Sequence, residues 1–219
     1  LLFTPNPYPE LMKISIDHDW LATSGAALTV KMPTFDAILG DKLTAFAPKS
    51  TGILYSKNRP VEMIKQLYDI AFLFDNIKDL EIVKSSYSKV VKEEIGFRKL
   101  KISVDEVLND TWNACFVLAE RNVKSAEFKH LQLGISKFSI EEAIIAAAKV
   151  AYLTVLIKSN FNGIIEIYKS PLEIKNWLIE EQDYNKLNKL KKNNPEAFFY
   201  WYQTFLLNLD NGINIKSES

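Results

Sequence analysis

The sequence has little of the chemistry that builds disulfides and metal sites. Its 219 residues include one cysteine, Cys115, and two histidines, His18 and His130. A single cysteine excludes an internal disulfide and a thiolate zinc cage, and two isolated histidines exclude most His-rich metal sites. Cys115 lies in an apolar helical pattern, so we expect it to be a small core residue.

Net charge and long apolar runs are also missing. Lys plus Arg and Asp plus Glu each number 27, so the formal net charge is zero. This balance excludes a globally basic nucleic-acid coat, although a local basic patch is still compatible with it. The longest apolar run, residues 143–157, contains Lys149 and is too short to span a bilayer. We therefore expect a soluble, cytoplasmic protein with no membrane partner.

The chain begins with leucine rather than methionine, and a proline-rich stretch follows up to Pro9. Such a beginning is typical of neither a translation start nor a signal peptide. It is typical of a strand that ends and leads into a loop inside a domain. We therefore expect that part of the protein precedes Leu1.

Two short strands and a long helical region are predicted. Residues 11–16 and 28–32 alternate between apolar and polar side chains, as strands do. Beyond them apolar residues recur with helical spacing, except at residues 164–168, which fit a short strand or a loop. Helix start signals lie at Thr34, Pro60, Asp79, Ser103, Ser139, Pro171 and Pro195. The predicted fold class is α+β, mostly α.

One segment has an unbalanced charge. Residues 42–65 hold five cations and one anion, a net charge of +4 in a neutral chain. The cations are Lys42, Lys49, Lys57, Arg59 and Lys65. A local excess of this size favours a phosphate-bearing ligand.

Four residues of this region are the candidate site residues. Lys42 lies on the helix before the basic loop, and Lys65, Tyr68 and Asp69 share one face of the helix after it. A cation, an aromatic ring and a carboxylate could thus converge on one cleft. The alternative is structural: Lys65 and Asp69 would form an ordinary i,i+4 ion pair, and Tyr68 would be a partly buried helix residue.

Two motifs in this region resemble a known family. Residues 41–46 (Asp-Lys-Leu-Thr-Ala-Phe), a basic loop containing glycine, and residues 65–70 (Lys-Gln-Leu-Tyr-Asp-Ile) follow one another. This arrangement resembles the abortive-infection nucleotidyltransferase toxin family (AbiEii/AbiGii-type), itself similar to the polymerase-β-like nucleotidyltransferases. The resemblance covers about residues 5–75. Where the family often has Arg-Asp, this chain has Lys65-Gln66.

The resemblance implies a reaction, its cofactors and its partners. A nucleotide would pass from a nucleoside triphosphate, with Mg²⁺, to an RNA acceptor such as tRNA. The protein would belong to a phage-defence toxin–antitoxin system and would bind an antitoxin protein. Lys42 and Asp69 would be the catalytic residues, with Lys42 on the triphosphate and Asp69 orienting the acceptor or the nucleotide. Lys42, Lys65 and Tyr68 would bind the nucleotide.

The resemblance also implies a division into domains. Residues 1–47 would be the C-terminal part of a nucleotidyltransferase α/β domain, and residues 48–219 would form a helical domain. The family's metal-binding carboxylates follow a Gly-Ser or Gly-Gly turn, and no such turn and strand precede residue 11. We therefore expect those carboxylates upstream of this chain, and no metal ligand is assigned within it.

Two alternatives stay open at this stage. Asp17-His18-Asp19 follows a strand and has the Asp-x-Asp spacing of a shared metal site, but acidic residues at strand exits are commonly turn formers. The other alternative concerns function: a non-enzymatic helical module that binds a protein or RNA partner. The aromatic cluster at residues 198–205 could be such an interaction surface, although core packing is the favoured interpretation.

Overall fold

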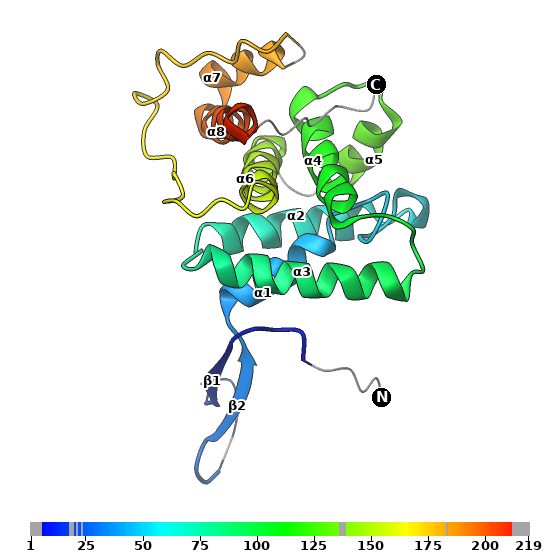
Figure 1. Ribbon diagram of the computed structural model, residues 1–219, viewed down its shortest axis with the longest axis vertical. Coiled ribbons are helices and arrows are strands. Elements are labelled where there is room, and N and C mark those ends of the chain that lie inside the picture. Colours follow the sequence, from blue (N-terminus) through cyan, green and yellow to red (C-terminus); the bar gives the residue numbers. More distant parts are fainter. Residues whose placement is uncertain are drawn as a thin grey trace.

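In the computed structural model, which describes residues 6–17, 20, 22, 24–135, 139–182 and 184–211, a β-hairpin projects from a helical body (Figure 1). The strands are β1 (Leu11–Ile16) and β2 (Leu28–Pro33). The helices are α1 (Phe35–Thr44), η1 (Tyr55–Lys57), α2 (Pro60–Phe74), α3 (Leu80–Phe97), α4 (Val104–Glu120), α5 (Ala126–Ile135), α6 (Ile140–Lys158), η2 (Asn185–Lys189), α7 (Leu190–Asn193) and α8 (Pro195–Asn211). The predicted class, α+β and mostly α, is confirmed.

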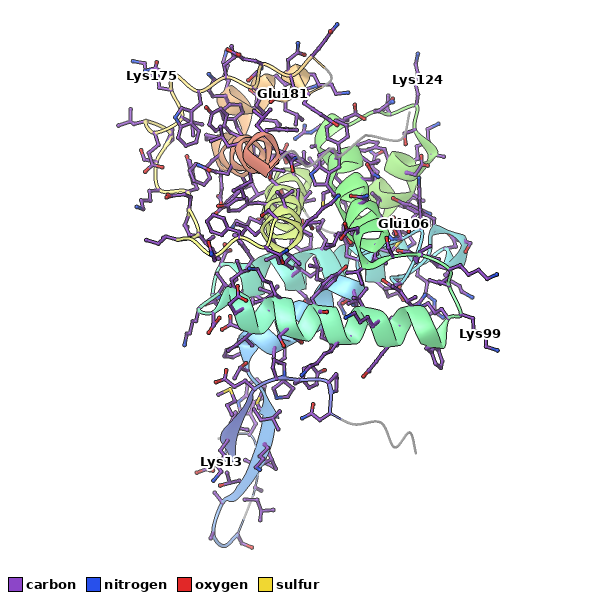
Figure 2. The ribbon with its side chains drawn as sticks, in the orientation of Figure 1. Lys13, Lys99, Glu106, Lys124, Lys175 and Glu181 are labelled. Carbon is purple, nitrogen blue, oxygen red and sulfur yellow. The ribbon has the colours of Figure 1, made fainter. Side chains whose placement is uncertain are left out.

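The hairpin is amphipathic but covered on neither face. Its strands pair antiparallel, and directly opposite residues share a face. One face is entirely apolar and is formed by the pairs Met12–Met32, Ile14–Val30 and Ile16–Leu28. Most of these side chains are exposed, Leu28 to 73 %. The opposite face places Lys13 beside Lys31, and Figure 2 shows Lys13 on the hairpin away from the helical body.

Helix α1 is clamped onto α3 by a close backbone approach. A Cβ atom at Gly40 would lie 2.4 Å from the Val83 carbonyl oxygen, so only glycine permits this packing. The Ser86 hydroxyl donates to the Ala37 carbonyl oxygen at 2.6 Å. The Asp36 carboxylate accepts from the backbone N–H groups of Lys78 and Asp79 just before α3. Together these contacts fix α1 within the helical body.

One hydrophobic core joins the helices on both sides of residue 47. It includes Leu39 and Leu43 of α1 as well as residues of α2, α3, α4, α6 and α8. Helix α6 is buried around almost its whole circumference, because α2, α4 and α8 all pack on it. The division at residue 47 stays a prediction, since one continuous core neither requires nor excludes it.

The aromatic cluster belongs to this core, as the favoured interpretation predicted. Five aromatic side chains of α8 are buried: Phe198, Phe199, Tyr200, Trp201 and Phe205. The Trp201 ring meets Trp112 of α4 at a centroid distance of 5.7 Å, and Trp112 stacks on Phe116 at 5.2 Å. Cys115 is fully buried beside them, as expected. Edge and stacked contacts of this kind stabilise a core beyond simple burial.

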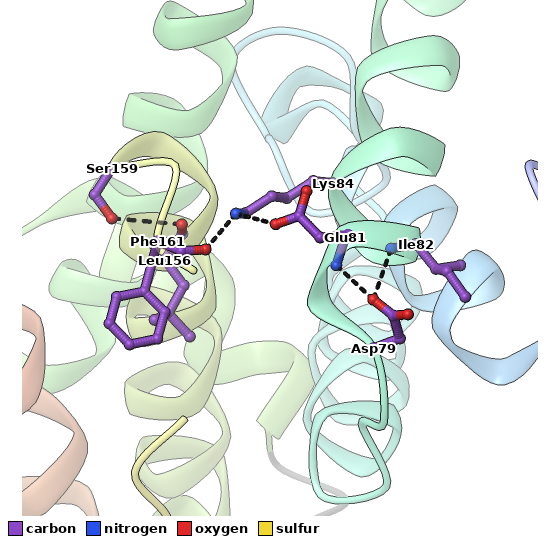
Figure 3. A network of polar contacts seen from close by, with 7 residues as sticks. All are labelled: Asp79, Glu81, Ile82, Lys84, Leu156, Ser159 and Phe161. Carbon is purple, nitrogen blue, oxygen red and sulfur yellow. Dashed lines mark hydrogen bonds and ion pairs between the residues drawn. The ribbon is translucent and has the colours of Figure 1, made fainter. Parts of the chain in front are cut away.

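Several predicted helix starts are confirmed at their caps. Asp79 accepts from the N–H groups of Glu81 and Ile82, and Figure 3 shows this cap beside Lys84. Lys84 of α3 donates to Glu81 and to the Phe161 carbonyl oxygen, which ties α3 to the chain after α6. Ser103 forms the full capping box with Glu106.

Three parts of the sequence-based prediction need comment. The helix predicted to start at Pro171 is wrong, because residues 171–176 form turns. The ambiguous residues 164–168 are a loop. Helix α5 was not anticipated. In the part of the chain that the structure describes, no helix is both long enough and apolar enough to cross a membrane.

Candidate functional site

The predicted site residues lie on α1 and α2, whose starts are set by sequence. Thr34 caps α1, and Pro60 occupies the first turn of α2, where its missing N–H costs nothing. Lys42 lies in the last turn of α1. Gln66 and Asp69 are three residues apart on α2 and therefore share a face. Because α1 packs on α2, the Lys42 side chain can reach that face.

Lys42 and Asp69 meet in the structure. The Lys42 ammonium nitrogen lies 2.9 Å from Asp69 Oδ2 and 3.2 Å from Gln66 Oε1. The side chains of Lys42 and Asp69 are 35 % and 47 % exposed, so the pair is accessible to a ligand from solvent. These contacts are charge-assisted and fix the ammonium between two acceptors.

The alternative pairing of Lys65 with Asp69 is not the one that forms. Among the described residues, the ion pair of Asp69 is with Lys42, and Lys65 is exposed on the surface of α2. Two effects favour Lys42 over Lys65 as the partner of Asp69. On a helix, a lysine four residues before an acid forms the weaker of the two possible ion-pair orientations. In addition, Lys42 gains the Gln66 amide oxygen as a second acceptor.

Tyr68 faces another part of the molecule. Its hydroxyl donates to the Ser139 carbonyl oxygen at 3.0 Å, just before α6. Burial, together with the nearby Glu142 carboxylate, raises the pKa of Tyr68 to about 12. The ring lines a cavity between α2, α6 and α8 that Lys42 does not line. Tyr68 thus takes part in different contacts from Lys42 and Asp69, rather than in one cleft with them.

A tyrosine that the sequence did not single out lies next to the cluster formed by Lys42, Gln66 and Asp69. The Tyr8 hydroxyl donates to Asp41 Oδ2 at 2.6 Å, and Asp41 directly precedes Lys42. Burial, and secondarily this hydrogen bond, raises the pKa of Tyr8 to about 12. The contact ties the chain before β1 to the end of α1. Since Thr34 N–H also donates to the Glu10 carbonyl oxygen, the base of the hairpin is held beside the cluster.

In the folded structure, acidic side chains partly compensate the positive charge of residues 42–65. Besides the Lys42–Asp69 pair, Lys49 lies near Asp110, a carboxylate that is only 8 % exposed. Asp110 Oδ2 accepts from the Lys49 N–H at 2.8 Å and from the Ser50 hydroxyl at 2.6 Å. Burial outweighs these contacts and raises the pKa of Asp110. Of the five cations, Lys42 is half-buried, and Lys49, Lys57, Arg59 and Lys65 are exposed.

No group of three or more potential metal ligands exists among the residues that the structure describes. Asp17 is exposed after β1, and His18 and Asp19 lie outside the described residues. The described residues therefore do not fit the Mg²⁺ that the family resemblance implies.

Comparison with known proteins does not place the chain in a family. No family model, curated protein or solved structure matches it.

Proposed function

We propose that this chain is part of a nucleotidyltransferase-like toxin of a phage-defence toxin–antitoxin system. In the proposed reaction an acceptor hydroxyl on RNA, such as tRNA, attacks the α-phosphorus of a nucleoside triphosphate and pyrophosphate leaves. The main support is the contact between Lys42 and Asp69. Each motif supplies one of these residues, they are 27 positions apart in sequence, and their side chains meet at 2.9 Å.

The roles follow from charge and exposure. The Lys42 ammonium would turn from Asp69 toward the triphosphate, since both side chains are partly open to solvent. Asp69, released from Lys42, would orient the acceptor hydroxyl or the bound nucleotide. Lys65 is exposed on the same helix and would neutralise phosphate charge at the edge of the nucleotide site. Tyr68 is left out of the proposed nucleotide site, because its hydroxyl donates to the Ser139 carbonyl oxygen and its ring lines a different cavity.

The hairpin supports the same proposal. An isolated two-stranded hairpin is at best marginally stable, and this one leaves a whole apolar face uncovered. In the proposed protein it is the edge of a larger catalytic sheet. The metal-binding carboxylates would lie on other strands of that sheet.

A non-enzymatic module that binds a protein or RNA partner is the second candidate. Two observations favour it: the exposed apolar hairpin, which is also a suitable surface for a partner, and the lack of a metal-ligand group among the described residues. Under this alternative the Lys42–Asp69 pair would be an ordinary surface ion pair.

Nucleotide transfer by the protein expressed from its complete gene distinguishes the two. The purified protein is incubated with Mg²⁺, each nucleoside triphosphate labelled at the α-phosphorus, and a tRNA pool, and label in RNA is counted. We expect transfer by the wild type and by Lys89→Ala, an exposed lysine of α3, and strongly reduced transfer by Lys42→Ala. Absence of transfer with all four nucleotides would favour the binding module.

A further inference from the structure

A cavity of about 350 Å³ lies between α2, α6 and α8, on contacts that the proposed reaction does not use. Helices α2 and α6 each contribute residues at positions i, i+3, i+4 and i+7, so a full face of each lines it. Its walls are apolar or aromatic: Tyr68, Ala71, Phe72, Ile145 and Ala146. Its charged residues are Asp75, Glu142, Lys149 and Glu196.

The charge of the cavity is negative. Three carboxylates face one ammonium group, which leaves a net charge of −2. Lys149 is already bound, with its nitrogen 2.8 Å from Asp75 Oδ1 and 2.8 Å from Glu196 Oε1. In the part of the chain that the structure describes, the Glu142 carboxylate makes no hydrogen bond or ion pair. A phosphate would be repelled here, whereas a second cation would find an unpaired carboxylate.

The aromatic residues add a second feature that favours a cation. Tyr68 and Phe72 are one turn apart on α2, and Phe72 is 67 % exposed. The faces of aromatic rings attract ammonium and guanidinium groups. Lys149 shows this chemistry within the cavity, because its nitrogen lies 5.7 Å from the Tyr200 ring centroid as well as on two carboxylates.

We propose that this cavity binds the side chain of a lysine or arginine presented by a partner protein. The cationic end would pair with Glu142 beside the Tyr68 ring, and the alkyl stem would lie on Ala71, Ile145 and Ala146. The exposed Phe72 would pack against the partner's backbone around that side chain. A net charge of −2 and a small volume suit one such side chain. This inference does not depend on the proposed nucleotide transfer.

Titration with blocked amino acids tests the chemistry directly. N-acetyl-lysine and N-acetyl-arginine methylamides are added to the labelled protein, and the NMR signals of Ala71, Phe72 and Ala146 are followed. N-acetyl-norleucine methylamide is the neutral control, because it has the stem without the charge. We expect saturable shifts with both cationic probes, weakened by added salt, and affinity for norleucine at least about fivefold lower. Equal binding of all three probes would overturn the proposal.

Variants locate the binding. The affinity for the cationic probes should fall by at least about fivefold in Glu142→Gln and in Phe72→Ala. Both residues are exposed, so neither change removes a buried contact of the fold. Glu93→Gln, an exposed acid on α3, is the matched control and should leave binding unchanged. An unchanged affinity of Glu142→Gln for the cationic probes would contradict the assignment. Spermidine binding more than about tenfold tighter than either probe would instead assign the cavity to free polyamines.

Discussion

Helix α2 takes part in two lysine–carboxylate clusters that differ in burial. Near its middle, Asp69 and Gln66 hold Lys42 of α1, with both charged side chains about a third to a half exposed. At its end, Asp75 shares Lys149 of α6 with Glu196 of α8, and the Lys149 side chain is only 10 % exposed. Burial alone would lower the pKa of Lys149, but the hydrogen bonds to the two carboxylates outweigh it and the pKa is raised.

The difference separates scaffold from candidate site. A buried ammonium shared by three helices cannot exchange its partners for a ligand without leaving charges unpaired. A half-exposed ion pair contributes little to stability, so its members are free to bind something else. Lys149 is therefore assigned to the fold, whereas the contacts of Lys42 leave it available for the proposed ligand.

The largest expected effect is on the buried cluster. Lys149→Met keeps the alkyl stem but leaves Asp75 and Glu196 facing each other without a cation. We expect the free energy of unfolding, measured by urea denaturation, to fall by about 2–3 kcal/mol, less than for a fully buried pair because the carboxylates are partly exposed. Lys89→Ala is the control; equal losses in both variants would contradict the comparison.

The exposed cluster should respond in ligand binding. Lys42→Ala removes one charge-assisted contact to the triphosphate and should weaken nucleoside triphosphate binding by about 1–2 kcal/mol. Titration calorimetry on the protein from its complete gene measures this, with Lys89→Ala as reference. Equal affinities for wild type and Lys42→Ala would take Lys42 out of the site.

Asp110 extends the comparison to a buried carboxylate that accepts hydrogen bonds from two neutral donors, the Lys49 N–H and the Ser50 hydroxyl. Because burial raises its pKa in the folded state, the folded protein holds this proton more tightly than the unfolded chain. Wild-type stability should therefore decrease, relative to Asp110→Asn, as the pH rises from about 4 through the folded pKa. Parallel stability curves for the two proteins would show that Asp110 does not titrate in this way.

The fold was predictable where local signals decide it. Pro60 and the Asp79 and Ser103 caps mark helix starts that the structure confirms. Pro171 gave the same signal without a following apolar face, and no helix forms there. Helix α5 is short and contains Gly134, an unfavourable helix residue. The reason for that glycine is tertiary, since a Cβ atom there would lie 2.2 Å from the Pro60 carbonyl oxygen.

The candidate site was predictable in its residues but not in its pairing. Sequence spacing placed Asp69 with Lys65 because both lie on one helix, and it grouped Tyr68 with them for the same reason. The pairing that forms depends on how α1 crosses α2, which in turn depends on Gly40 and Asp36 holding α1 on α3. Such long-range packing leaves no periodic pattern in the sequence.

The most direct test measures stability and transfer together in Asp69→Asn, in the protein from its complete gene. Because the Lys42–Asp69 pair is partly exposed, its loss should change the melting temperature by about 1 °C. Loss of an orienting carboxylate should lower nucleotide transfer and toxicity by about two orders of magnitude. We predict that combination. A variant that melts like the wild type and remains fully active and toxic would show that Asp69 is only a surface ion-pair partner.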